Sequence, residues 1–319
     1  MAHRDTYIAR INRVVDHIDA HLVDALDLST LAALAHFSPW HFHRLFQALA
    51  GETLAERVRR RRLEVAASRL LAAPPVAALT IALDVGFGSA EVFTRAFKAH
   101  FGVTPSTWRR GAWQEWAARH REQLGRIHQA QRKTHRAVLE SLRHDSLPRP
   151  ADRVTGPEGP TLDVAIRTLA DTRVAYMRHV GPYGSAGISR LWPRFTAWCT
   201  QRGLLQAQRS MIGIAQDSPD LTAAEKCRYD ACIEVDTGFR PEGEVGVQTL
   251  IGARYACVRF TGTALDIHAA WQRVFAHWLP DSGWQADDRP AIELYDKGAD
   301  TAAPDGSFTC LLCVPLRPL

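Results

Sequence analysis

The sequence has no long apolar run and no cysteine before Cys199. A membrane-spanning helix needs roughly eighteen or more consecutive apolar residues, so we expect no contact with a membrane. The first residues, 1–5, lack the apolar stretch of a secretory signal, and no lipidation motif is present, so we expect a cytoplasmic protein. The cysteines match no structural zinc spacing, and no Ser-His-Asp or metal-ligand constellation occurs. We therefore expect no metal, no cofactor, no catalytic residue and no enzyme.

Charge is distributed unevenly along the chain. Residues 1–150 hold 22 Lys and Arg against 14 Asp and Glu, a net charge of +8, whereas residues 151–319 hold 17 against 20, a net charge of −3. The basic half indicates a polyanionic partner, and the other half a different task. A chain of 319 residues with ordinary globular composition is long enough for two domains.

An internal repeat of 51 residues occupies the first 110 positions. The recurring residues are, in pairs, Ser38 and Ser89, Phe42 and Phe93, Arg44 and Arg95, Phe46 and Phe97, Gly51 and Gly102, and Thr53 and Thr104. In each copy an apolar helix pattern leads to a tight turn at a small residue, Ala35 or Gly86, and then to a second helix that a serine begins and a glycine ends. This order predicts two helix-turn-helix units, with the four phenylalanines in their packing core.

A further helix pattern, at 54–72, joins the two units and stops before Pro74. It carries a run of arginines that includes Arg57, Arg60 and Arg61. A stiff connecting helix would hold the two recognition helices in successive major grooves, about 34 Å apart along the duplex. We therefore expect these three arginines to contact the phosphates between the grooves, although a solvated helix face is the alternative for such a run.

Residues 7–110 resemble the DNA-binding domain of the AraC/XylS family, of the Rob type. The second unit carries the family signature almost in full, as Ile81-Ala82-x3-Gly86-Phe87-x-Ser89-x3-Phe93-x-Arg95-x-Phe97-Lys98-x3-Gly102-x-Thr104-Pro105. Trp108-Arg109 follows where Tyr-Arg is usual, and Ser38-x-Trp40-His41-x-x-Arg44 resembles the first recognition helix of this branch.

The resemblance implies that side chains of both recognition helices contact bases. Where Rob-type proteins have two glutamines, this chain has Ala90 and Glu91. Glutamine can pair with adenine, whereas alanine cannot, and glutamate prefers a cytosine amino group or repels phosphate. We therefore expect the second unit either to read a different base or mainly to hold the protein in position. The resemblance also implies RNA polymerase as a partner. The predicted base-contacting residues are Trp40, His43, Arg44, Glu91, Thr94 and Arg95.

The rest of the chain divides into a helical connector and linker at 111–160 and a C-terminal domain at 161–319, with a Pro/Gly-rich break at 147–160. The C-terminal domain contains its own repeat, in which Arg173-x-Ala175-x-x-Arg178-x-x-Gly181 returns as Arg254-x-Ala256-x-x-Arg259-x-x-Gly262. Each copy shows the order strand, helix, strand, strand. We therefore predict an all-α double helix-turn-helix domain at 1–110, followed by an α+β domain of two βαββ repeats with a pseudo-two-fold antiparallel sheet.

The two C-terminal copies differ at Glu293 and Tyr295, which stand where the first copy has Gly213 and Ala215. Strand alternation places Glu293 and Tyr295 on one face. If water covers that face, the pair is an ordinary polar surface. If the face lines a cleft between the copies, a carboxylate among aromatic rings is a cation site.

Residues 162–317 resemble the GyrI-like (BmrR-like) effector-binding domain. The matching stretches are Arg178-His179-x-Gly181-Pro182-Tyr183, Ile212-Gly213-Ile214, Arg228-Tyr229-Asp230-x-Cys232-Ile233, Trp278-Leu279-Pro280-x-Ser282-Gly283 and Pro290-x-Ile292-Glu293-x-Tyr295. The resemblance implies that Glu293 lies at the floor of a hydrophobic pocket that admits flat, often cationic compounds. The predicted pocket walls are Tyr295, Tyr183, Trp192 and Trp271.

These features predict a sequence-specific transcription regulator that binds double-stranded DNA and a small organic effector of cationic or aromatic character. Two alternatives remain at this point. One is a GyrI-like hydrolase that uses the pocket glutamate as acid or base, which conversion of a ligand would support. The other is a protein-binding module that acts on a DNA-associated assembly, which a shallow cleft without a buried Glu293 would support.

Overall fold

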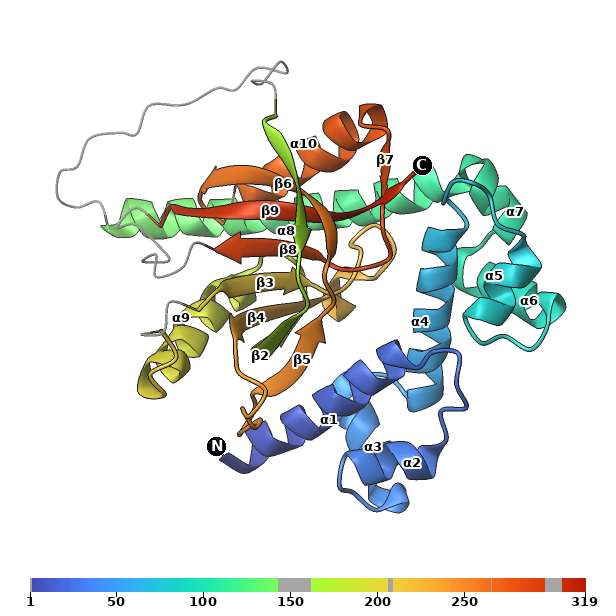
Figure 1. Cartoon of the computed structure of the whole chain (residues 1–319), viewed down its shortest axis with the longest axis horizontal. Coiled ribbons are helices and arrows are strands. Elements are labelled where there is room, and N and C mark those ends of the chain that lie inside the picture. The colour runs from blue at the N-terminus through green and yellow to red at the C-terminus, as the bar shows by residue number, and fades with distance from the viewer. Residues whose placement is uncertain (1, 143–161, 206–208, 265, 296–305) are drawn as a thin grey trace.

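The computed structural model describes residues 2–142, 162–205, 209–264, 266–295 and 306–319. Its N-terminal part is helical, and its C-terminal part combines a sheet with helices, as predicted (Figure 1). The N-terminal elements are α1 (Ala2–Ala20), α2 (Leu28–Leu34), α3 (Pro39–Ala50), α4 (Leu54–Arg69), α5 (Ala78–Asp84), α6 (Ala90–Phe101), α7 (Pro105–Thr107), a π-helical turn (Trp108–Ala112) and α8 (Trp113–Leu142).

Both predicted helix-turn-helix units form, as α2–α3 and α5–α6. Gly51 and Gly102 end the second helix of each unit with left-handed backbone, at φ of 69° and 78°, where glycine has no Cβ penalty. Ser89 caps α6 by accepting a hydrogen bond from the Val92 amide, whereas Ser38 makes no such bond to the start of α3. The four repeated phenylalanines are buried in the cores of the two units, as expected.

Helix α4 begins with a capping box between Thr53 and Glu56. It ends at Arg69, three residues before the predicted limit of 72, because the chain leaves helical geometry ahead of Pro74. The connector between the domains is helical through α8, and the proposed linker at 147–160 lies outside the described residues.

The C-terminal domain contains a nine-stranded sheet, and all its strand pairs are antiparallel. Its strands are β1 (Val164–Leu169), β2 (Thr172–Val180), β3 (Met211–Ala215), β4 (Arg228–Glu234), β5 (Gly246–Leu250), β6 (Ala253–Gly262), β7 (Trp284–Ala286), β8 (Ala291–Tyr295) and β9 (Phe308–Pro318). The order β1-β6-β9-β8-β3-β4-β2-β5 places the local two-fold axis between β3 and β8. The helices are α9 (Ala186–Gln201), which contains Pro193, and α10 (Ile267–Arg273), which continues as a π-helical turn (Val274–Trp278).

The two βαββ repeats form as predicted, and the second also contains the short strand β7, which pairs with β9. Each repeat is preceded by a strand that the repeat pattern did not include. That strand pairs with the opposite copy: β1 of the first repeat lies against β6 of the second, and β5, which leads into the second repeat, lies against β2 of the first. The outer edge of each copy is therefore completed by the other copy.

The two faces of the sheet have different neighbours. Tyr229, Ala231 and Ile233 of β4 point to the face that α9 and α10 cover. Cys232 belongs to the core of the opposite face, which Arg228 and Asp230 share by strand alternation. Helix α1 contacts this opposite face, and Figure 1 shows α1 beside β5. Strands β2 and β4 thus lie between the helix-covered core and α1. Arg61 of α4 bonds Asp217, in the loop after β3.

Candidate DNA-binding helices and ligand site

The predicted base-contacting side chains all lie on the two recognition helices, α3 and α6. Trp40 is 80% exposed, and His43 and Arg44 are exposed beside it, while Phe42 and Phe46 fix the other side of α3 in the core. The exposed side of α6 presents the other three in the same way: Glu91 and Arg95 are exposed and Thr94 is half-buried. Among the exposed large apolar side chains of the described residues, Trp40 has the largest exposed fraction.

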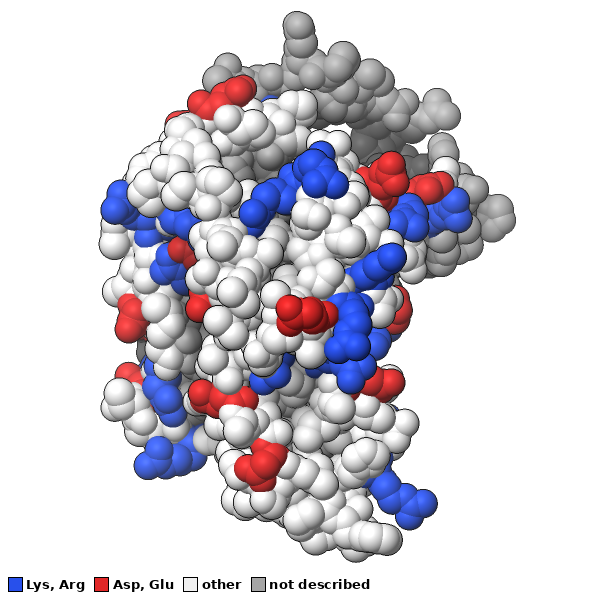
Figure 2. Space-filling view, turned by 90° about the vertical axis from the view of Figure 1, so that its right-hand side faces the viewer, with Lys and Arg blue, Asp and Glu red and all other residues white. Residues whose placement is uncertain are grey.

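Figure 2 views the molecule from the side that carries α5, α6 and α7 in Figure 1. Lys and Arg side chains are spread over this face among uncharged atoms, and acidic side chains lie close to several of them. The excess of Lys and Arg in the N-terminal half therefore does not form a continuous basic patch on this face.

The structure contradicts the predicted phosphate contacts of Arg57, Arg60 and Arg61. Arg57 and Arg60 are only 4% and 8% exposed, and Arg61 is mostly buried. Arg60 bonds the carboxylates of Glu52 and Glu64 at 2.6 and 2.9 Å. These guanidinium groups face carboxylates of the protein instead of solvent, because the side of α4 that carries them is turned toward the C-terminal domain.

Arg59 and Arg62 are the two arginines of this run that were not predicted to contact phosphate, and both line a concavity between the two helix-turn-helix units, together with the Gly86–Gly88 turn. Arg62 donates to the carbonyl oxygens of Leu22 and Gly86, whereas Arg59 is exposed. The helical period could have predicted that Arg59 is exposed. Residues at spacings of three and four share one face of a helix, which here carries Arg57, Arg60, Arg61 and Glu64, and residue 59 points away from that face.

Asp19 and Asp217 join the two domains through the buried arginines. Asp19 of α1 lies 2.6 Å from Arg228 of β4 and 3.2 Å from Arg61 of α4, and Asp217 lies 2.7 Å from Arg228 and 2.9 Å from Arg61. Burial alone would raise the pKa of both carboxyls, but the Arg228 and Arg61 guanidinium groups hold each pKa well below its usual range. Both carboxylates are therefore ionised at neutral pH.

A second set of interdomain contacts surrounds Arg178 of β2. It bonds Asp230 and, on α1, Asp16, each at 2.7 Å, and the Tyr176 hydroxyl also donates to Asp16. Farther along, Lys226 bonds Glu52 at 3.0 Å. Burial would raise the pKa of Glu52, but Arg60 and Lys226 lower it to about 2. Contacts of this density between groups that face each other favour one defined arrangement of the domains.

Glu293 of β8 lies on the helix-covered face and is only 9% exposed. The hydroxyls of Tyr229 and Tyr295 donate to its Oε2 at 2.5 and 2.9 Å, and the Trp271 side chain also bonds it. Burial raises the pKa of the Glu293 carboxyl, and these three hydrogen bonds oppose that rise without cancelling it. Within the described ranges, no lysine or arginine forms an ion pair with Glu293.

Aromatic rings surround this carboxylate. Trp192 of α9 donates from Nε1 to the Tyr229 hydroxyl at 3.2 Å, and its ring lies 4.9 Å from that of Tyr295. Trp271 of α10 packs on the same core. The structure therefore places Glu293, Tyr295, Trp192 and Trp271 together, as the resemblance implied, and adds Tyr229, which sequence analysis did not select. Tyr229 belongs to the stretch Arg228-Tyr229-Asp230 that resembles the GyrI-like domain, and that position could have indicated a role in the site.

Tyr183 has a different role at the edge of this group. Its hydroxyl donates to the carbonyl oxygens of Asp217 and Arg228, each at 2.9 Å, and accepts from the Asp217 amide. Its ring packs on the same core as Trp192. Tyr183 thus connects the wall of the aromatic group to the two residues that hold the domains together.

Gly213 makes space for the carboxylate. It stands directly opposite Glu293 across the β3–β8 pair. A Cβ added at Gly213 would lie 2.1 Å from the Tyr229 hydroxyl and 2.7 Å from Glu293 Oε2. The two differences between the copies therefore depend on each other, because the glycine of one copy leaves the space that the buried glutamate of the other occupies.

The described part of the chain shows no cluster of His, Cys, Asp and Glu suited to a metal ion. In that same part, no helix combines the length and apolar character needed to cross a membrane.

Comparison with known proteins separates the chain into two matched parts. A family model described as a GyrI-like small molecule binding domain matches residues 162–317, and a helix-turn-helix domain model matches residues 31–111. The transcriptional regulator Rob of Salmonella typhimurium is 41% identical over 102 residues, which are 32% of this chain and 34% of Rob. The chain thus matches about a third of the length of Rob.

Two further relatives are matched over most or all of their length. The regulatory protein SoxS of Salmonella typhimurium is 34% identical over 100 residues, 31% of this chain and 92% of SoxS. The SPbeta prophage-derived protein YosT of Bacillus subtilis is 27% identical over 156 residues, 49% of this chain and 100% of YosT. The chain belongs to the AraC-type helix-turn-helix transcription regulators, and its residues 162–317 match the GyrI-like small molecule binding domain.

Proposed function

We propose that this regulator binds a cationic aromatic effector at Glu293 and that the occupied site changes how the N-terminal domain engages its operator. The observation that carries the proposal is the burial of Glu293 among four aromatic side chains without a basic partner in the described residues. An unpaired buried carboxylate is costly, and a flat cation would compensate its charge while stacking on the rings.

Strand β4 supplies the connection between effector and operator. Tyr229 bonds Glu293 on one face of the sheet. On the other face its neighbour Arg228 bonds Asp19 of α1, and its neighbour Asp230 bonds Arg178, which in turn bonds Asp16 of α1. An effector that displaces the Tyr229 hydroxyl shifts Tyr229, which lies between Arg228 and Asp230 in the chain. Both of these neighbours take part in the contacts between the domains. The free energy available for the switch is the difference in effector affinity between the two domain arrangements.

On the DNA side, we propose that the exposed residues of α3 and α6 contact bases in two successive major grooves. Arg59, which is exposed between the units, replaces the buried arginines as the proposed phosphate contact. RNA polymerase is proposed as a further partner from the family resemblance. The protein is proposed to bind its effector without converting it.

The test is a fluorescence titration of the full chain with a flat cationic dye and a neutral analogue of the same shape. Five tryptophans lie in the C-terminal half and report binding. We expect Glu293→Gln to weaken the cation about tenfold or more and to leave the neutral analogue and free DNA affinity unchanged. Glu225→Gln removes the same charge from an exposed position and serves as the control.

Equal affinity of wild type and Glu293→Gln for the cation would reject the site. Recovery of a chemically altered dye after incubation would favour the hydrolase alternative instead. The burial of Glu293 already counts against the shallow-cleft alternative of a protein-binding module.

A further inference from the structure

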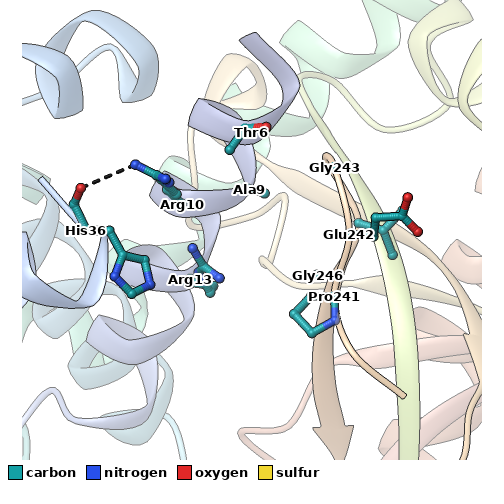
Figure 3. A pocket seen from close by; sticks show the side chains of 10 residues that line it. Thr6, Ala9, Arg10, Arg13, His36, Pro241, Glu242, Gly243 and Gly246 are labelled. Carbon is teal, nitrogen blue, oxygen red and sulfur yellow. Dashed lines mark hydrogen bonds between the residues drawn. The ribbon is translucent and has the colours of Figure 1, made fainter. Parts of the chain in front are cut away.

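A cavity lies between the two domains, on the side of the sheet away from Glu293. It has a volume of about 270 Å³. One wall is α1 together with the turn before α3, and the other is the loop 241–246 that leads into β5 (Figure 3). The cavity therefore touches the first helix-turn-helix unit and the effector-binding domain at once.

Two arginines of α1 line this cavity. Arg10 and Arg13 are three residues apart, so they share one face of the helix. Arg10 donates to the His36 carbonyl at 3.2 Å and lies 5.2 Å from the centre of the Phe37 ring, which fixes its guanidinium group. The Nε of Arg13 is buried and has no hydrogen-bond partner among the described residues. A buried donor left without a partner needs an explanation, and a ligand supplies one.

The acidic groups around the cavity are engaged elsewhere. Glu242 bonds Arg202 at 2.7 Å, and in Figure 3 its carboxylate points away from Arg10 and Arg13. Glu244 bonds Arg194 at 3.0 Å. The cavity is thus left with an excess of positive charge.

The opposite wall is held close to α1. A Cβ added at Gly246 would lie 2.4 Å from the Tyr176 ring, so the loop rests directly on that ring, whose hydroxyl in turn bonds Asp16 of α1. Because this wall belongs to the C-terminal domain, a DNA duplex would have to displace it to reach both arginines. A small molecule fits the space between the two walls without such a displacement.

We propose that this cavity binds a small organic anion that carries a carboxylate or phosphate group. Guanidinium groups recognise both groups through paired, charge-assisted hydrogen bonds. Pockets for drug-sized ligands span roughly 300–1,000 Å³, so the cavity suits a smaller molecule. Because its walls come from both domains, the bound anion stabilises their present arrangement and forms a second regulatory input, of opposite charge preference to the site at Glu293.

The experiment is calorimetric titration of the full chain with succinate and with inorganic phosphate, at constant ionic strength. We expect one saturable site per chain for at least one probe, and Arg13→Gln to weaken it about tenfold or more. Arg167→Gln removes one positive charge from the exposed face of β1, at the far edge of the sheet, and should bind as wild type does.

A second pair of variants tests the cavity without touching an arginine. Gly243 has φ of +61°, which Asn and Asp tolerate, and a Cβ there meets no atom within 4 Å. Gly243→Asp should weaken the anion by adding negative charge at the wall, while the neutral, equally large Gly243→Asn should bind nearly as wild type does.

The proposal fails if neither probe saturates, or if Arg13→Gln and Gly243→Asp bind as tightly as wild type. If neither probe saturates and Arg13→Gln weakens binding to specific and random DNA alike and lowers its salt dependence, the arginines contact a DNA phosphate instead.

Discussion

At the scale of single residues, Glu293 shows how one buried charge affects both binding and stability. Burial raises the pKa of its carboxyl in the folded chain above the ordinary value of 4.5. The folded state therefore holds this proton to higher pH than the unfolded state does. Its favourable contribution to stability is present at low pH and is lost as the pH rises through the unfolded and then the folded pKa.

We accordingly expect Glu293→Gln to be more resistant to heat than wild type at neutral pH, because glutamine needs no ionised form there. The difference should shrink as the pH falls toward 4.5, where Glu293 becomes protonated in both states. Thermal unfolding from pH 4 to 8 measures it, with the exposed Glu225→Gln as control. A wild type that is the more stable protein at neutral pH would contradict this assignment.

A second residue-scale prediction separates base contacts from phosphate contacts. Arg44→Ala on α3 should lose about 1–3 kcal/mol of discrimination at one base position. Arg59→Ala on α4 should weaken all sequences alike and lower the salt slope. Gel-shift titrations on operator and random duplexes at several salt concentrations distinguish them. Equal losses on both duplexes for Arg44→Ala would remove Arg44 from the base-contacting set.

At the scale of elements, local patterns predicted helices and repeats well and their tertiary orientation poorly. Both helix-turn-helix units and both βαββ repeats follow from periodicity and from paired residues in the sequence. Whether the arginines of α4 face solvent or the protein interior does not follow from the sequence. It depends on Asp217 and Arg228, which lie more than 150 residues away from Arg61 in the chain. An arginine run looks the same in sequence whether DNA or a protein carboxylate neutralises it.

The exchanged strands were missed for a related reason. Strands β1 and β5 have no partner within their own repeat, so the similarity between the copies, which starts at Arg173 and Arg254, did not include them. In the candidate ligand site, the Glu293–Tyr295 pair was found because it breaks the repeat. Tyr229 was not, because no sequence pattern shows that β4 and β8 bring their side chains together across β3.

The β3–β8 pair offers an element-scale prediction. Gly213→Ala should destabilise the fold by roughly 1–3 kcal/mol, because the added methyl overlaps the Tyr229 hydroxyl and Glu293. It should also weaken the cationic effector. Gly238→Ala is the matched control, since a Cβ there meets nothing within 4 Å. Denaturant unfolding and dye titration test both effects, and equal behaviour of the two variants would show that β3 can move aside.

At the scale of the whole molecule, Asp19 neutralises three buried arginines contributed by both domains: Arg57, Arg61 and Arg228. Asp19→Asn removes one of the two carboxylates that Arg61 and Arg228 share, so that Asp217 alone bridges them in a poorly solvated interface. Breaking a buried ion pair from one side typically costs about 3–5 kcal/mol. We expect the domains to separate, and the arginines of α4 then to become available to DNA.

Small-angle scattering should show a larger radius of gyration for Asp19→Asn, and its DNA binding should depend more steeply on salt than that of wild type. Asp236→Asn is the control, since this carboxylate, which pairs with Arg209, is itself largely exposed. An unchanged radius together with an unchanged salt slope would show that the interface survives without this carboxylate.

The exchange of β1 and β5 has a consequence for how the chain is made. While the second repeat is still on the ribosome, β2 has only β4 beside it, because β5 comes later in the chain, and β1 has no partner at all until β6 emerges. Open strand edges of this kind invite pairing with other chains. Neither repeat is therefore a self-sufficient folding unit, and a chain severed between β4 and β5 would regain its sheet only when both fragments meet.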